Sequence, residues 1–361
     1  MTALSAFVAS IGLPEIIAGI MVLGLNAYVL MGGADFGGGV WDLLAGGPRR
    51  DAQRDLITKS IAPIWEANHV WLIVVVVVMF TAFPLAFSTL AIVLHIPITL
   101  MLVGIVLRGS AFVFRSYGSS ERGSRRRWGI AFAGASAVTP VLLGMIIGAI
   151  ASGDVATASG RIGTGSFSEV FVSPWLAPFP TAVGLFALAL FAFLAAVYLT
   201  IEASDDAALR DDFRARALAA AIAVAVFAGV ALFLSRRAAP RVMEGVVGGS
   251  WSWLLHVCTA ASAVTAIVAL WRRGFRLARV AAAAQVSLIL WGWVLAQYPY
   301  IVPMTISIRQ ASAPRVTLTL LLVGLGGGAL VLIPSLRYLM RTFAGHAADS
   351  TIEVDRRAPP S

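Results

Sequence analysis

The sequence is poor in the residues that build soluble or metal-binding proteins. It has one cysteine, Cys258, which excludes an intramolecular disulfide and any metal site made of several cysteines. Its four histidines are too few to supply every ligand of a protein that carries several haems. Charged residues make up only 12% of the chain, whereas a soluble domain has about 25%. Because the chain has too few charged residues to cover the surface of a soluble protein, we expect it to lie in a membrane.

What the sequence does contain supports this expectation. Hydrophobic residues make up 59% of the chain, and the mean hydropathy is +0.88. The net charge of +9 would favour nucleic-acid binding in a soluble protein. Here the basic residues fall in short loops, so they indicate membrane topology and we expect no nucleic-acid partner. No Lys or Arg precedes Arg49, so the basic region of a cleaved signal peptide is not expected.

Nine segments are long and apolar enough to cross a bilayer as helices, which takes about 20 residues each. They are 13–33, 66–85, 88–107, 129–151, 177–200, 216–234, 252–270, 279–298 and 316–340. A turn at Pro84 separates the second from the third. With nine spans, most of the 27 basic residues fall on one side. The positive-inside rule then places the N-terminus outside and the C-terminus in the cytoplasm.

The loops between the spans are too short to fold as separate domains. We therefore predict one polytopic membrane domain over residues 1–343. Residues 344–361 are polar and end in APPS, which predicts a disordered cytoplasmic tail.

Asp35 lies within the run VLMGGADFGGGVWDLL at the end of the first span. Glycines in a membrane helix allow a neighbouring backbone to approach closely, or allow the helix to unwind. Asp35 could be a helix-end carboxylate that pairs with a loop arginine, or an entry point for protons or ions. A third hypothesis is a secondary transporter whose substrate site is a glycine-broken helix around Asp35, although no second cluster of glycines and acids is visible.

The strongest candidate site lies in the run IAPIWEANHVWLI, where the second span begins. Glu66, Asn68 and His69 fall within one helical turn, between Trp65 and Trp71. An ionisable side chain in a bilayer is costly unless it is paired, hydrated or neutralised, so it suggests a function. We expect these three side chains to form a proton path with water. The competing interpretation is a belt of aromatic and polar residues at the membrane surface.

Two arginines flank GSAFVF at the end of the third span. Arg108 is a candidate partner for a carboxylate such as Asp35 or Glu66, whereas Arg115 is expected to face lipid. His95 and His256 each stand alone, which is weak evidence for a haem ligand. The segment YPYIVP, 298–303, could hold a quinone or a lipid tail, or could be an interfacial anchor.

Three segments together resemble subunit II of the cytochrome bd-type quinol oxidases. GGADFGGGVWDLL is similar to the family's DGFDxGxGxL motif, SIAPIWEANHVWLI to GPxWDGNxVWL, and YPYIVPMTI to an FPFxxPS-like segment. The resemblance spans nearly the whole chain. Gly32 replaces the first acid of the first motif, Glu66 replaces the aspartate of the second, and Ala67 replaces its glycine. The chain therefore resembles a divergent member, and the cyanide-insensitive branch is one candidate.

The resemblance implies an all-α membrane protein with two four-helix bundles and one peripheral helix. It implies a heterodimer in the bacterial cytoplasmic membrane, in which a larger subunit I binds haem b and haem d, or only b-type haems, and reduces dioxygen to water with electrons from quinol. Subunit II would bind no haem or metal and hold no catalytic residue, and would stabilise subunit I. A proton route, a structural quinone and a small single-helix subunit occur in some members, and the resemblance leaves all three open here.

Overall fold

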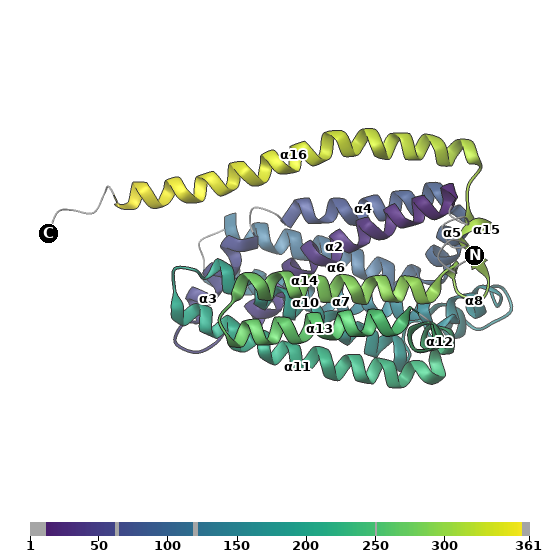
Figure 1. Cartoon of the computed structure of the whole chain (residues 1–361), viewed down its shortest axis with the longest axis horizontal. Coiled ribbons are helices and arrows are strands. Elements are labelled where there is room, and N and C mark those ends of the chain that lie inside the picture. The colour runs from purple at the N-terminus through teal and green to yellow at the C-terminus, as the bar shows by residue number, and fades with distance from the viewer. Residues whose placement is uncertain (1–11, 62–64, 118–121, 250, 356–361) are drawn as a thin grey trace.

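The computed structural model describes residues 12–61, 65–117, 122–249 and 251–355, which are almost entirely helical. The long helices lie lengthwise beside one another, so their ends gather at two ends of the molecule (Figure 1). We call these the α3 end, which holds helix α3 (Arg50–Ile61), and the α12 end, which holds helix α12 (Pro240–Gly248). The long helices are α2 (Leu13–Leu43), α4 (Trp65–Ala82), α6 (His95–Tyr117), α7 (Arg122–Ser152), α10 (Pro178–Glu202), α11 (Ala207–Ala238), α13 (Ser252–Trp271), α14 (Phe275–Gln297) and α16 (Arg315–Asp355).

Short elements connect the long helices. They are α5 (Pro84–Val93), α8 (Asp154–Ser159), α9 (Phe167–Phe171), α15 (Ile308–Ala311) and a hairpin of β1 (Tyr300–Val302) and β2 (Ile306–Ser307). The two strands pair antiparallel at the α12 end, directly after α14.

The number of spans agrees with the sequence, but their limits differ. Among the described residues, eight helices are long and apolar enough to cross a membrane, and the bent pair of α4 and α5 would make a ninth. The chain bends by 117° between these two helices, because Pro84 lacks an N–H and disfavours a helical residue before it. The expected third span, 88–107, is therefore wrong at its start. Residues 84–93 form α5, and His95 is the first residue of the span in α6 instead of lying in the interior of a span.

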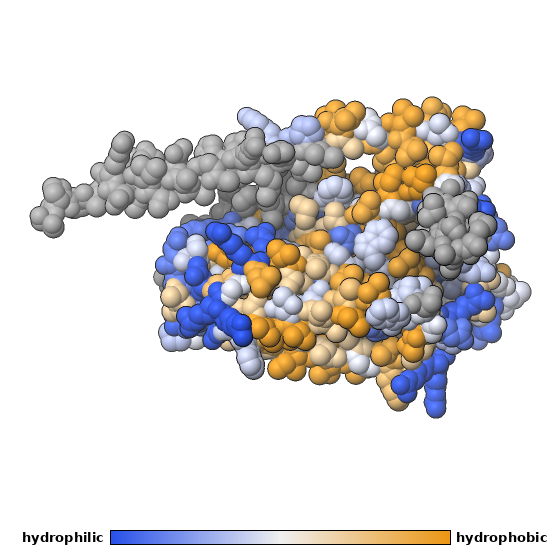
Figure 2. Space-filling view, in the orientation of Figure 1, coloured by the Kyte–Doolittle hydropathy of each residue, from blue (hydrophilic) through white to orange (hydrophobic). Residues whose placement is uncertain are grey.

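The face of the molecule that Figure 2 shows is mostly apolar in its middle and more hydrophilic toward both ends. Large apolar side chains such as Phe233 on α11, 68% exposed, and Leu330 on α16, 79% exposed, point away from the protein. Such a band is expected where helices face lipid.

Helix α16 lies apart from the other helices, and packs mainly on α2 and α4 (Figure 1). This position fits the predicted peripheral helix; the arrangement of the rest in two four-helix bundles stays a prediction. The backbone of α16 remains helical to Asp355, within the predicted disordered tail. The first proline of the tail is Pro359, so no proline stops the helix earlier.

Helix α2 runs unbroken through its glycines and packs against α7 and α10. A Cβ atom at Gly37 would collide with the main-chain oxygen of Phe191 on α10, and one at Gly39 would collide with Ser136 on α7. The glycines therefore allow close helix packing and do not unwind the helix. A substrate site in a broken helix at Asp35, as the transporter hypothesis requires, is contradicted by this continuity.

Candidate functional site

Helices α2 and α6 are joined by two ion pairs at matching intervals. Asp35 and Asp42 lie seven residues apart on α2, and Arg108 and Arg115 lie seven apart on α6. Seven residues are about two helical turns, so each pair of residues shares one face of its helix. Asp35 pairs with Arg108, which we call the inner pair, and Asp42 pairs with Arg115, which we call the end pair.

The inner pair is almost completely buried. The exposed fractions of the Arg108 and Asp35 side chains are 1% and 0%. Besides the Asp35 carboxylate, Arg108 donates from Nε to the Ser136 hydroxyl at 3.0 Å and from Nη2 to the main-chain oxygen of Asp35 at 3.3 Å. Its guanidinium carbon lies 4.8 Å from the ring centre of Phe36 and 5.1 Å from that of Phe132. These contacts offset the several kcal/mol that burying each ion costs.

The end pair is closer to solvent and more completely bonded. Arg115 donates to both carboxylate oxygens of Asp42, at 2.8 and 3.0 Å. Arg54 of α3 adds a second cation, with Nε 3.7 Å from Asp42 Oδ1, and donates to the Asp42 main-chain oxygen at 3.3 Å. The prediction that Arg115 faces lipid is therefore wrong. Asp42 was not among the predicted site residues, although the seven-residue spacing shared by the two acids and the two arginines could have indicated it.

Helices α2 and α4 each carry buried polar atoms without a partner among the described residues. Among the described side chains these are Asn26 Oδ1 and Asp35 Oδ2 on α2, and His69 Nδ1 and both amide atoms of Asn68 on α4. Asn68 is completely buried. Buried polar groups in folded proteins are normally bonded to protein or to water, so this group of atoms requires an explanation.

His69 lies beside the inner pair. Its ring centre is 6.0 Å from that of Phe36, the residue after Asp35, and 6.1 Å from that of Tyr28. The structure thus brings Asp35, Arg108 and His69 together, with Asn68 adjacent on α4. Tyr28 and Ser136, which help to enclose them, were not among the predicted site residues.

Other predicted residues have different positions. The backbone of Trp65 and Glu66 forms the start of α4, but their side chains lie outside the described residues. Trp71 is partly buried against the main core. His95 and His256 each direct Nδ1 to a main-chain oxygen, that of Ile92 at 2.9 Å and that of Ser252 at 2.6 Å.

Comparisons with known proteins point to one family. The family model for cytochrome bd terminal oxidase subunit II matches residues 13–343. A protein of Bacillus subtilis described as putative cytochrome bd menaquinol oxidase subunit II is 24% identical over 88% of this chain and 91% of its own length. Cytochrome bd-I ubiquinol oxidase subunit 2 of Escherichia coli is 28% identical over 58% of this chain and 53% of its own length.

The fold has a solved counterpart. A chain of the bd oxidase from Geobacillus thermodenitrificans superposes with a TM-score of 0.74 at 23% identity, covering 92% of this chain and 98% of that one. The apolar helices and these similarities together make the chain a multi-pass protein of the bacterial inner membrane.

Proposed function

Because the chain belongs to the cytochrome bd terminal oxidase subunit II family, we propose that it is the haem-free subunit of a quinol oxidase that reduces dioxygen to water. Its membership makes it part of a quinol oxidase complex that contains haems and a partner subunit I. In the proposal, the chain stabilises subunit I and conducts cytoplasmic protons toward the oxygen site there.

The observation that carries the proton route is that His69 of α4 lies against Tyr28 and Phe36 of α2, beside the inner pair, and that Asp35, Asn68 and His69 each have a buried polar atom without a described partner. Amide and imidazole groups both donate and accept hydrogen bonds. In the proposal, Asn68 and His69 are therefore members of a row of hydrogen bonds that includes water and along which a proton can move. Asp35, paired with Arg108, lies beside His69, so in the proposal the inner pair is part of this hydrogen-bonded route. Glu66, in the first turn of α4, would receive protons at the α3 end, which we propose to be cytoplasmic.

The histidines support placing the haems on subunit I. His69 packs against the rings of Tyr28 and Phe36, as a core side chain does. The cavity that His256 lines has no second histidine, methionine or cysteine among its described walls that could supply a sixth ligand to a haem iron. A structural quinone and a small single-helix subunit stay options for the complex.

The proton route is tested by three variants of the assembled complex: Glu66→Gln, Asn68→Leu and His69→Gln. We expect quinol oxidase turnover per haem to fall at least about tenfold in each, since a positioned proton carrier contributes 10²-fold or more. Asn68→Leu should not lower the thermal midpoint, because it removes two unsatisfied polar atoms.

The matched control is Thr139→Val. Thr139 is equally buried, and its hydroxyl donates to the main-chain oxygen of Ala135 at 2.7 Å, within its own helix. It should leave turnover per haem unchanged. Full turnover in all three test variants would refute the route through this chain, while leaving its family unaffected.

A further inference from the structure

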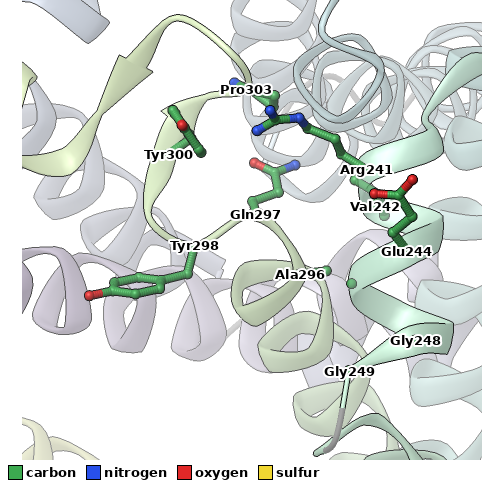
Figure 3. Close-up of a pocket in the computed structure, with 11 residues that line it drawn as sticks. Arg241, Val242, Glu244, Gly248, Gly249, Ala296, Gln297, Tyr298, Tyr300 and Pro303 are labelled. Atoms are coloured by element: carbon green, nitrogen blue, oxygen red, sulfur yellow. The ribbon is translucent and has the colours of Figure 1, made fainter. Parts of the chain in front are cut away.

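A polar pocket of about 400 Å³ opens at the α12 end, between α12, the end of α14 and strand β1 (Figure 3). The guanidinium of Arg241 extends over the pocket toward Gln297 and Tyr300. Its carbon atom lies 5.3 Å from the ring centre of Tyr300. Arg241 is exposed and forms no salt bridge with a described residue.

Gln297 gives the pocket a second unmatched donor. The residue is buried, with 8% exposed, and its Nε2 has no acceptor among the described residues. The carboxylate in the pocket lining belongs to Glu244, which stays beside α12 and away from Gln297 (Figure 3). The pocket therefore suits a ligand that brings negative charge and acceptor oxygens.

An apolar cavity of about 500 Å³ adjoins this pocket, and Val242 lines both. Its walls come mainly from α10, α11, α13 and α14 and are mostly aliphatic and aromatic. Trp293, one helical turn before Gln297 on α14, also lines the cavity, and its indole N–H has no acceptor in the part of the chain that the structure describes. The site thus has a cation, Arg241, at its mouth, two neutral donors, Gln297 and Trp293, further in, and an apolar cavity beyond them.

We propose that the pocket and the cavity together bind one anionic diacyl phospholipid. Arg241 would bind the phosphate, and Gln297 and Trp293 would donate to the ester carbonyls. An acyl chain would occupy the apolar cavity. A neutral quinone has carbonyl oxygens for the two neutral donors but no anion for Arg241, so the charge favours the phospholipid.

Native mass spectrometry of the complex, purified in mild detergent from its own membrane, tests this assignment. We expect the wild type to retain one phosphatidylglycerol-like lipid. Arg241→Gln should lower the ratio of lipid-bound to lipid-free complex about tenfold, which corresponds to about 1.4 kcal/mol for the lost charge-assisted hydrogen bond. Arg236→Gln is the matched control, because Arg236 lies at the same end but does not line the pocket. Equal retention in both variants, or a quinone in place of the lipid, would overturn the proposal.

A second experiment tests the same assignment even if the lipid is lost during purification. Phosphatidylglycerol added to the delipidated wild-type complex should raise its thermal midpoint, because a ligand that binds only the folded state stabilises it. Ala228→Phe places a ring in the apolar cavity, and should abolish this shift without changing turnover. A shift of equal size in the wild type and in Ala228→Phe would contradict the assignment of the cavity.

Discussion

The inner pair and the end pair use the same chemistry on the same two helices, but their surroundings differ. Asp42 is held by two arginines, and both of its carboxylate oxygens are bonded. Asp35 is held by one arginine, and its Oδ2 has no partner among the described residues. The end pair is close to solvent, whereas the inner pair is surrounded by apolar rings and unpartnered polar atoms.

This contrast indicates what each pair does. The end pair is fully bonded and lies near the helix ends, so a structural role is enough to account for it: it connects α2, α3 and α6. A buried ion pair contributes little net stability, and neighbouring unpartnered polar atoms lower stability further. Such a costly arrangement in a membrane is typical of a functional site. We therefore interpret the end pair as structural and the inner pair as part of the proton route.

The largest effect should come from breaking the inner pair on one side. Arg108→Met leaves the Asp35 carboxylate buried without its cation, which should cost about 3–5 kcal/mol. We expect little assembled complex in the membrane, measured by haem content and by the thermal midpoint of whatever assembles. Normal assembly of Arg108→Met would show that Asp35 is not an obligate buried anion.

A smaller loss of stability should follow from a change that crowds Ser136, the hydrogen-bond partner of Arg108. Gly39 contacts Ser136, the residue whose hydroxyl accepts from Arg108, so Gly39→Ala must displace Ser136. Overpacking of this kind costs about 1–3 kcal/mol. Gly19→Ala, in the same helix but with nothing within 4 Å of its added Cβ, should instead be neutral or slightly stabilising. Equal thermal midpoints for the two variants would contradict the packing account.

The end pair should matter for stability alone. Asp42→Asn removes the charge that Arg115 and Arg54 share, and should lower the free energy of unfolding by about 1.5–3 kcal/mol. Turnover per haem should stay at the wild-type value, since the residue lies outside the proposed route. A loss of turnover per haem greater than in Asp35 variants would reverse the two assignments.

The smallest effect concerns an exposed acid that belongs to neither pair. The main-chain N–H and the hydroxyl of Ser166 donate to Glu169, which lowers the pKa of this carboxyl below its usual value. The stabilisation is therefore present above the usual pKa and is lost as the pH falls through the lowered one. Glu169→Gln should reduce the change in thermal midpoint between pH 6 and about pH 3 slightly. No difference from the wild type would show that this capping contact contributes nothing.

Part of the fold and of the candidate site could be predicted from the sequence. Apolar runs and the charges of the loops predicted nine spans, where the described residues form eight or nine. The sequence also predicted Asp35 or Glu66 as a partner for Arg108, and the structure pairs Arg108 with Asp35. The sequence could not show that Ser136, far along the chain, completes the inner pair. Nor could hydropathy place the limits of α5 and α6, since both the bend at Pro84 and the start at His95 lie within one apolar stretch.

The measurement that tests the account most directly is turnover per haem of a complex in which both members of the inner pair are apolar, Asp35→Leu with Arg108→Met. Replacing a buried ion pair by apolar side chains of similar volume is often neutral or stabilising, so we expect the complex to assemble. The account predicts that its quinol oxidase turnover per haem falls at least about tenfold, because the polar route beside the pair is disrupted. Wild-type turnover per haem in the assembled double variant would contradict it and leave the inner pair, like the end pair, purely structural.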